Sequence, residues 1–295
     1  PPIHYTICKQ ALLSGKHVYV EKPLCLKYSE GKELVLLAKE KGLYLGCAPD
    51  TFLGAGIQTC KNVIDNGKIG KPIGGVAYMM CRGHETWHPS PEFYYQNGGG
   101  PLFDMGPYYI TALVSMLGKV ESVMAYAHKG FEERIITSQP KYGKKITVEV
   151  DTHTVALLKF ANGATITMTM SFDVLTHTLP NIELYGTLGS IKVPDPNNFG
   201  GSVMLSTLTN KDYTEIPLIT PYYENSRGIG LTDTIKAIEE NRQNCASGEL
   251  ALHVLEVMES IDKSASLGVR VNITSTPPTL PNLDWSAPLG EIKTL

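Results

Sequence analysis

The chain has 295 residues, of which 42% are hydrophobic and 19% are charged, and this composition is typical of folded globular proteins rather than disordered ones. Its 26 Lys and Arg residues nearly balance its 29 Asp and Glu residues, so we expect no nucleic-acid partner. No apolar run approaches the ~18 residues of a membrane helix, and no signal-peptide pattern opens the chain, so we also expect no membrane partner. At about 150 residues per domain, the length predicts two domains.

The first 48 residues alternate between helix and strand patterns. Apolar residues at helical spacing predict a helix that Gly15 ends, and residues 17–20 follow as a short strand. A second helix, for which Ser29 is a candidate cap, ends at Gly42 and leads into a strand over residues 43–47. Strands connected by helices predict a parallel α/β sheet.

From about residue 52 the pattern becomes mainly β, after one helix that Asn66-Gly67 closes. Asn162-Gly163 lies between two alternating runs and predicts a hairpin. Consecutive strands without helices between them predict a large, mainly antiparallel open sheet, and a second copy of the chain could cover its free face, so we expect a homo-oligomer formed through this sheet. Strands are predicted at 73–81, 119–128, 151–160, 164–172, 181–187 and 202–208, helices near 106–117, 229–246 and 249–267, and loops at 129–150 and 277–288.

Glu21-Lys22-Pro23 directly follows the strand at residues 17–20. Open α/β sheets bind their ligands at the carboxyl ends of the strands, so Lys22 is well placed to act on a ligand. The proline restricts the backbone of the lysine and helps to direct its side chain. A solvated lysine in a surface loop remains the alternative interpretation.

A glycine-rich segment, Asn97 to Tyr108, contains a second candidate site. Three consecutive glycines permit close approach of a ligand to the backbone, and Asp104 and Tyr108 share one face of a helix at i, i+4 spacing. The alternative is structural: Asp104 would cap the helix, with Pro107 in its first turn.

Three other patterns indicate chemistry less directly. Gly54 to Thr59 nearly matches the dinucleotide fingerprint, but the pattern fails at its third position and no strand directly precedes it, so we interpret it as a chance match. Trp87, His88 and Tyr94 lie in one loop and suit polyol binding, although ordinary loop packing explains them equally well. The spacing of the histidines and of the six cysteines predicts neither a metal site nor disulfides, which fits a reducing cytoplasm.

Two motifs together resemble those of the glucose-fructose oxidoreductase, inositol 2-dehydrogenase and rhizopine catabolism (Gfo/Idh/MocA) family. The first extends from Pro1-Pro2-Ile3-His4 to Glu21-Lys22-Pro23, and the second is Gly98 to Tyr108. Their order and separation also agree with the family. The resemblance implies that residues 1–50 are the C-terminal part of a Rossmann-type dinucleotide-binding domain and that residues 51–295 form an α+β domain for substrate binding and oligomerisation.

The resemblance also implies an activity: NAD(P)-dependent hydride transfer to or from a sugar, polyol or related hydroxyl compound. It assigns catalysis to Lys22, Asp104 and Tyr108, with Tyr108 standing where most members carry histidine. A phenol is a poor base alone, because it ionises near pH ~10, and a nearby ammonium group favours its phenolate. The implied cofactor contacts are Pro2, His4, Glu21 and Lys22, and the expected substrate contacts are Trp87, His88 and Tyr94.

The glycine-rich fingerprint that binds the pyrophosphate, and the acidic residue that distinguishes NAD from NADP, are expected before Pro1. We therefore expect a fragment of a longer protein, an incomplete record of it, or a naturally shortened member. The alternatives to an enzyme are a regulatory or ligand-binding member of the same family and a chain that cannot bind the cofactor.

Overall fold

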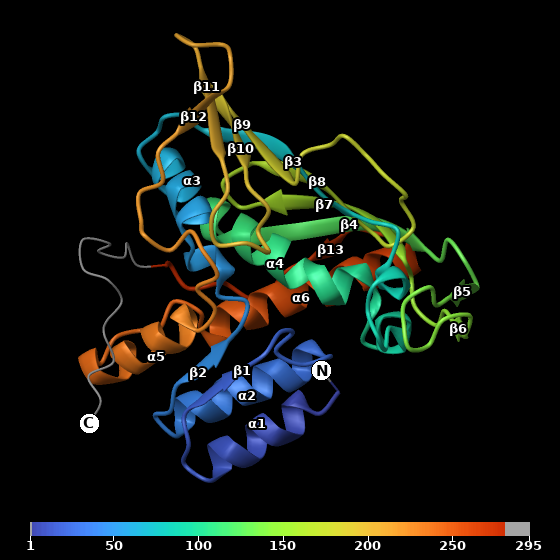
Figure 1. Cartoon of the computed structure of the whole chain (residues 1–295). Coiled ribbons are helices and arrows are strands. Elements are labelled where there is room, and N and C mark those ends of the chain that lie inside the picture. Colours follow the sequence, from blue (N-terminus) through green and yellow to red (C-terminus); the bar gives the residue numbers. More distant parts are fainter. Residues whose placement is uncertain (1, 281–295) are drawn as a thin grey trace.

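The computed structural model describes residues 2–280, and its first part is a small parallel α/β unit (Figure 1). Helix α1 (His4–Leu13) leads into strand β1 (Val18–Val20), and helix α2 (Tyr28–Glu40) leads into strand β2 (Leu45–Cys47). The two strands pair in parallel, as the alternation of helix and strand predicted. Ser29 does not cap α2, because the helix begins one residue before it and Lys27 holds the cap position.

Within the described residues, the second part is built on a nine-stranded sheet with the strand order β12-β11-β10-β9-β3-β8-β7-β4-β13. Its neighbouring strands are antiparallel except for β3 and β8, so the predicted fold class, a parallel α/β part followed by a large and mainly antiparallel sheet, is confirmed. The strands are β3 (Pro72–Met80), β4 (Val120–His128), β7 (His153–Phe160), β8 (Thr165–Ser171), β9 (Ile182–Gly186), β10 (Gly189–Val193), β11 (Val203–Thr207), β12 (Thr214–Ile216) and β13 (Val271–Asn272).

The segment 129–150, expected to be a loop, contains a separate hairpin of β5 (Glu133–Ile135) and β6 (Lys145–Thr147). The hairpin predicted at Asn162-Gly163 does connect β7 to β8, and Gly163 adopts a positive φ of 100° in its turn. Of the segment 277–288, residues 277–280 lie outside helices and strands, and the remainder lies outside the described residues.

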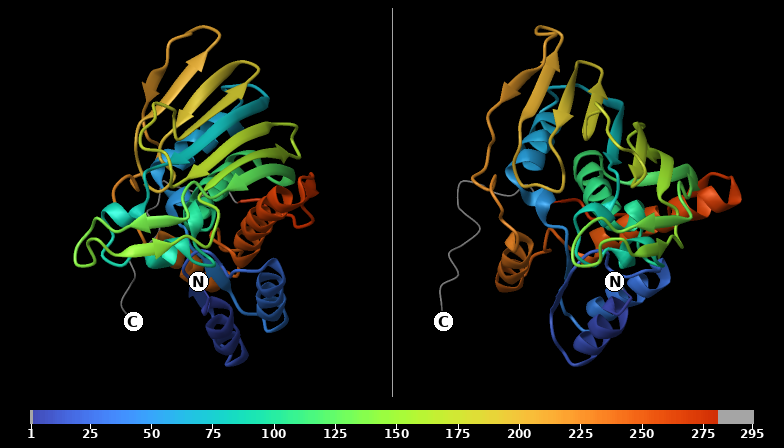
Figure 2. Two further views of the ribbon diagram at one scale, coloured as in Figure 1. Left: turned by 90° about the vertical axis from the view of Figure 1, so that its right-hand side faces the viewer. Right: turned by 45° about the vertical axis from the view of Figure 1, so that its right-hand side comes forward.

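Helices cover one face of the sheet, as Figure 2 shows. Apolar residues alternate along the strands: on β7, Ala156, Leu158 and Phe160 are buried beneath the helices, while Val155 and Leu157 face outward. The elements that complete this layer and its loops are α3 (Ala55–Asp65), α4 (Gly100–Leu117), α5 (Ile229–Glu240) and α6 (Gly248–Leu267), with short 3-10 turns η1 (Thr51–Leu53), η2 (His84–Thr86) and η3 (Glu92–Tyr95). None of the helices in the described part of the chain combines the length and the apolar character needed to cross a membrane.

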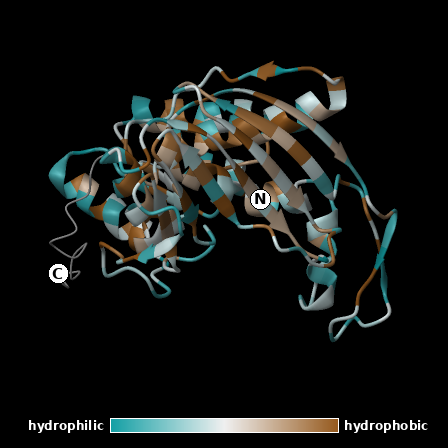
Figure 3. Cartoon of the chain, turned by 90° about the horizontal axis from the view of Figure 1, so that it is seen from above, coloured by the Kyte–Doolittle hydropathy of each residue, from teal (hydrophilic) through white to brown (hydrophobic). Residues whose placement is uncertain are grey.

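The other face of the sheet is open and partly apolar. Seen from above, hydrophobic residues lie side by side on neighbouring strands of this face (Figure 3). Four of them come from β4 and β7, with exposed fractions of 39% for Met124, 69% for Tyr126, 37% for Val155 and 46% for Leu157.

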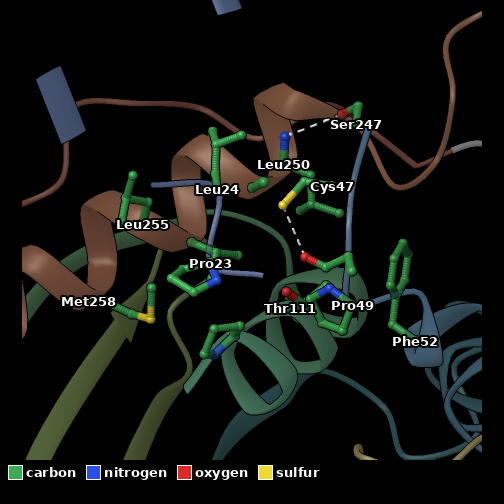
Figure 4. A pocket seen from close by; sticks show the side chains of 14 residues that line it. Pro23, Leu24, Cys47, Pro49, Phe52, Thr111, Ser247, Leu250, Leu255 and Met258 are labelled. Atoms are coloured by element: carbon green, nitrogen blue, oxygen red, sulfur yellow. Dashed lines mark hydrogen bonds between the residues drawn. The ribbon is translucent and has the colours of Figure 1, made fainter. Parts of the chain in front are cut away.

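Helix α6 ties the N-terminal unit to the rest of the molecule, because it packs against α2, α4 and β4. The amide of Cys47 donates to the carbonyl of Ala246 at 2.9 Å, and Gly46 pairs with Ser247 in an isolated antiparallel bridge. The loop that follows β1 is buried at this junction, where Pro23 and Leu24 line a narrow apolar pocket (Figure 4). The volume of this pocket is about 10 Å³, enough for a single water molecule and too small for a substrate.

Candidate active site

Lys22 and Asp104 meet where the N-terminal unit faces helix α4. The ammonium Nζ of Lys22 donates to Asp104 Oδ1 at 2.8 Å and to the main-chain carbonyl of Asp104 at 2.5 Å. The two side chains are only 16% and 17% exposed, so the interpretation of Lys22 as a solvated surface residue does not hold. Lys22 comes two residues after β1, at the carboxyl end of the strand where open α/β sheets place their ligands.

Asp104 lies within helix α4 rather than at its cap. The helix begins at Gly100, earlier than the sequence predicted, with Pro101 in its first turn and Pro107 in its interior. The capping interpretation of Asp104 is therefore wrong, and its carboxylate is available to other side chains.

Tyr108 follows Asp104 by one helical turn and is 7% exposed. Two cations lie near its ring: Lys22 Nζ at 5.1 Å from the ring centroid, and the guanidinium carbon of Arg227 at 6.0 Å. Lys22, Asp104 and Tyr108, which the sequence placed in two separate motifs, thus form one cluster. Arg227 was not predicted, because only the tertiary fold brings its loop to Tyr108.

His84, on the turn η2 that follows β3, was also missed. Its Nε2 lies 3.0 Å from Asp104 Oδ2, so the two carboxylate oxygens of Asp104 have different partners. Burial raises the pKa of Asp104, but the hydrogen bond with His84 and the charge of Lys22 outweigh burial and lower this pKa below its ordinary value. Asp104 is therefore a carboxylate at neutral pH.

The segment His84-Glu85-Thr86-Trp87-His88 has the H-E-x-x-H pattern of zinc peptidases, which our reading of the histidine spacing overlooked. That chemistry requires both histidines on one face of an α-helix, whereas here His84 begins a short 3-10 turn and His88 lies beyond its end. Glu85 accepts hydrogen bonds from the buried Arg134 and from Tyr95, so it is not available as a base. The described residues contain no group of three or more potential ligands arranged to hold a metal ion.

The three expected substrate contacts cluster around His84. The ring centroids of Trp87 and Tyr94 lie 5.2 and 4.4 Å from that of His84, and His88 lies 5.3 Å from both Trp87 and Tyr94. Trp87 is 60% exposed, and its indole offers a flat apolar surface beside His84, the partner of Asp104. Burial raises the pKa of Tyr94 to about 12, so its phenol remains a neutral hydrogen-bond donor.

The expected cofactor contacts lie around the loop that carries Lys22. His4 Nδ1 is 2.8 Å from the carbonyl of Pro23, so its ring fixes the loop, and burial lowers the pKa of His4. Glu21 is exposed, and one of its carboxylate oxygens accepts a hydrogen bond of 3.2 Å from the amide of Lys22. Pro2 is exposed just before α1, and Pro1, the first residue of the motif, lies outside the described residues.

The near-fingerprint at Gly54 has a packing role. The first amides of helix α3 are already used, since Ala55 donates to the carbonyl of Tyr222 and Gly56 to that of Phe199. A Cβ atom at Gly54 would lie 2.4 Å from the carbonyl oxygen of Phe199, so the glycine permits close contact with the 194–201 loop. No phosphate can take the place of these carbonyls without moving that loop.

A polar hollow of about 750 Å³ lies between this loop and the 223–227 segment. Its lining includes Asn197, Asn198, Ser202 and Arg227, and the Arg227 guanidinium donates to Asn197 Oδ1 at 3.3 Å. Because the same guanidinium lies near the ring of Tyr108, the hollow and the Lys22–Asp104 pair share a boundary.

A lysine at the carboxyl end of a parallel strand, paired with an acid on a helix that packs against a large open sheet, defines the class as an α/β protein that combines a small parallel unit with a mainly antiparallel sheet. Residues 1–48 match the model of the oxidoreductase family with an NAD-binding Rossmann fold, and residues 57–192 match that of the GFO/IDH/MocA C-terminal domain. The chain belongs to the Gfo/Idh/MocA oxidoreductase family.

Individual relatives agree with this assignment. An uncharacterised oxidoreductase of Schizosaccharomyces pombe is 30% identical over 163 residues, which are 51% of this chain and 43% of that protein. The D-xylose dehydrogenase of Paenarthrobacter nicotinovorans is 30% identical over 122 residues, 40% of this chain and 31% of the relative. The chain therefore spans less than half the length of these two relatives.

A solved structure of levoglucosan dehydrogenase in complex with NADH superposes with a TM-score of 0.77 and 22% identity, covering 93% of this chain and 78% of that one. This likeness establishes a shared fold.

Proposed function

We propose that this chain carries the reacting centre of an oxidoreductase that transfers hydride between NAD or NADP and a hydroxyl group of a sugar or polyol. The observation that carries the proposal is the contact of Lys22 Nζ with Asp104 Oδ1 at 2.8 Å, with Tyr108 beside it. Family membership supports the reaction class, and relatives named as D-xylose and levoglucosan dehydrogenases support the substrate class.

Oxidation of an alcohol requires that the hydroxyl proton leave as the hydride departs. In the proposed reaction the phenolate oxygen of Tyr108 takes this proton. The cations of Lys22 and Arg227, which lie near the ring of Tyr108, would stabilise the negative charge that develops on the substrate oxygen. Asp104 holds the Lys22 ammonium in place, and in the reverse reaction Tyr108 returns the proton.

The carboxyl end of β1 fits the nicotinamide end of the cofactor, because a charged lysine, an exposed carboxylate and a fixed loop converge there. Pro2, His4, Glu21 and Lys22 are the residues proposed to contact the cofactor. The bound nicotinamide supplies the hydride acceptor or donor. We assign no residue of this chain to the pyrophosphate, since Gly54 and its neighbours pack against protein.

The substrate is proposed to lie between the aromatic group of Trp87, His88 and Tyr94 and the polar hollow that contains Asn197 and Arg227. Sugar rings combine apolar C–H faces with hydroxyl groups, so an exposed indole together with a hollow lined by amide, hydroxyl and charged hydrogen-bonding groups suits them.

Three further proposals concern the whole protein. The apolar residues on the open face of the sheet support a homo-oligomer formed through that face. Six free thiols support a cytoplasmic location. The chain is proposed to divide into domains at residues 50 and 51, close to the boundary between the two family matches.

The test uses purified protein, with NADH and NADPH binding followed by nicotinamide fluorescence and turnover measured on a panel of aldoses, anhydrosugars and inositols. We expect Lys22→Met, Asp104→Asn and Tyr108→Phe each to lower kcat by about 100-fold or more. Asp104→Asn is expected to leave NADH affinity within about threefold, because Asp104 is not among the residues proposed to contact the cofactor.

Turnover of these variants at the wild-type rate would contradict the assigned roles. If the wild-type protein binds a sugar but neither nucleotide, the chain is instead a ligand-binding member of the family. If it binds neither kind of ligand, this chain alone cannot form the cofactor site.

A further inference from the structure

We propose that His84 is a positioning residue of this centre: its Nε2–H holds the Asp104 carboxylate in the orientation that presents Oδ1 to Lys22. The inference rests on the proposed function for its catalytic consequence. The structural part stands on the contacts of His84 alone.

The hydrogen bonds of His84 define its tautomer. The indole Nε1–H of Trp87 can only donate, and it lies 3.3 Å from His84 Nδ1. Nδ1 is therefore the acceptor in this contact, and Nε2, which lies 3.0 Å from Asp104 Oδ2, is the nitrogen that donates. The hydrogen bonds therefore converge on Asp104: Trp87 donates to His84 and His84 donates to Oδ2, while Lys22 donates to Oδ1 from the other side.

Hydrogen bonds from the neighbouring residues Tyr95, Glu85 and Arg134 hold the backbone at His84 in place. Its amide donates to the hydroxyl of Tyr95 at 3.2 Å, and this hydroxyl donates in turn to the carboxylate of Glu85. The guanidinium of Arg134, 3% exposed, donates to the other carboxylate oxygen of Glu85 at 2.8 Å. The buried pair of Glu85 and Arg134 therefore anchors the turn from which His84 projects.

The ring of His84 is also enclosed. Tyr94 and Phe172 lie with their ring centroids 4.4 and 4.5 Å from it, and the residue is 9% exposed. Exclusion of water strengthens the hydrogen bond to Asp104 and limits the rotation of both side chains. An acid held by a lysine alone could rotate about χ2 and offer either oxygen, whereas an acid held at both oxygens cannot.

The titratable groups that interact with Asp104 come from two segments: Lys22 from the loop after β1, and Cys81, His84 and Tyr94 from the segment after β3. Among the hydrogen bonds that lower the pKa of Asp104, the one with His84 is foremost. Removal of this donor is therefore expected to raise the pKa of Asp104.

The experiment compares His84→Leu, which removes the donor, with His84→Gln, whose amide nitrogen can replace Nε2–H. The first readout is the carbon-13 titration of the Asp104 carboxyl, assigned with Asp104→Asn, and it requires no enzymatic activity. We expect the midpoint to move to higher pH in His84→Leu and to return toward wild type in His84→Gln. His128→Gln, at the end of β4, is the matched control, and the Asp104 midpoint in this variant should equal that of the wild type.

The second readout is kinetic. Loss of a residue that orients a catalytic group typically costs about 10- to 100-fold in activity, so we expect this loss in kcat for His84→Leu, with KM within about threefold and recovery in His84→Gln. If His84→Leu does not fold, Trp87→Phe replaces it in the carbon-13 titration alone, because Trp87 is also a proposed substrate contact; it removes the donor to Nδ1, and a smaller shift of the Asp104 midpoint in the same direction is expected.

An unchanged Asp104 midpoint in His84→Leu, or in Trp87→Phe where that variant replaces it, overturns the positioning role whether or not the protein is a dehydrogenase. If the Asp104 midpoint shifts but the protein shows no nucleotide-dependent turnover, the positioning role of His84 stands and the proposed function is wrong. A loss of kcat that His84→Gln does not recover assigns His84 a merely structural role.

Discussion

Replacement of Lys22 by methionine is the perturbation whose size the structure defines most directly. The substitution keeps most of the side-chain volume but removes the ammonium group from Asp104, whose side chain is 17% exposed. Removing one partner of a buried ion pair typically costs 3–5 kcal/mol, and the residual exposure places the expected loss near the lower end, at about 3 kcal/mol at pH 7.

The loss should depend on pH with a defined sign. The pKa of Asp104 lies below its ordinary value, so its contribution to stability is present above pH ~4 and is lost as the pH falls through its folded-state pKa. The stability difference between Lys22→Met and wild type should therefore shrink in acid. The double variant Lys22→Met/Asp104→Asn should recover part of the lost stability, because Asp104 no longer leaves an unpaired buried charge at this position.

The assay is urea unfolding of these variants at pH 7 and pH 3, with Lys145→Met as the matched control. Lys145 pairs with Glu133 at 2.7 Å, but the side chains are 66% and 53% exposed, so its loss should cost less than about 1 kcal/mol. If Lys22→Met is as stable as Lys145→Met, or if the double variant is the least stable of the set, the ion pair does not carry the energy argued here.

Three further outcomes are expected. Burial lowers the pKa of His253 to about 4, so between pH 6.5 and pH 4 this histidine is protonated in the unfolded chain but not in the folded one. The free energy of unfolding should therefore fall by about 3 kcal/mol over this pH range. His253→Gln retains an acceptor for the amide of Val120, and urea unfolding of this variant should lack the pH dependence. Gly54→Ala should destabilise the fold by about 1–3 kcal/mol through its clash with Phe199, with NADH affinity by fluorescence unchanged; a selective loss of NADH affinity would restore the fingerprint interpretation. Tyr126→Glu should lower the mass measured by light scattering if copies associate through the open sheet, and an unchanged oligomer would place the interface elsewhere.

The order of elements could be predicted because long periodic segments carry strong signals. Helix α6 and strands β3, β4, β7 and β8 follow this rule. Strands β12 and β13 have only three and two residues at the edges of the sheet, so pairing rather than local pattern defines them. The β5–β6 hairpin buries only Arg134 and Ile146 on its paired strands, and one of these is charged, so hydrophobicity could not indicate it.

The candidate site was predictable only in part. The spacing of Asp104 and Tyr108 on one helix is local information, whereas Lys22 lies 82 residues from Asp104 and only the resemblance to a family linked them. His84 and Arg227 carry no local signal, since each acquires its partner through tertiary packing. The H-E-x-x-H pattern shows that a local sequence signal can also mislead: the residues match the zinc-peptidase motif, but they do not lie on the α-helix that its chemistry requires.

The bridge between Gly46 and Ser247 also determines when the N-terminal unit can finish folding. Strand β2 leaves the ribosome roughly two hundred residues before the segment that pairs with it, and at about 5–20 residues per second this interval lasts about 10–40 s. During translation, Leu24 and Cys47 therefore lack the cover that α6 later provides. The order of synthesis thus makes the lysine-bearing unit dependent on α6, which is made much later, and an apolar surface is exposed to chaperones until α6 packs against it.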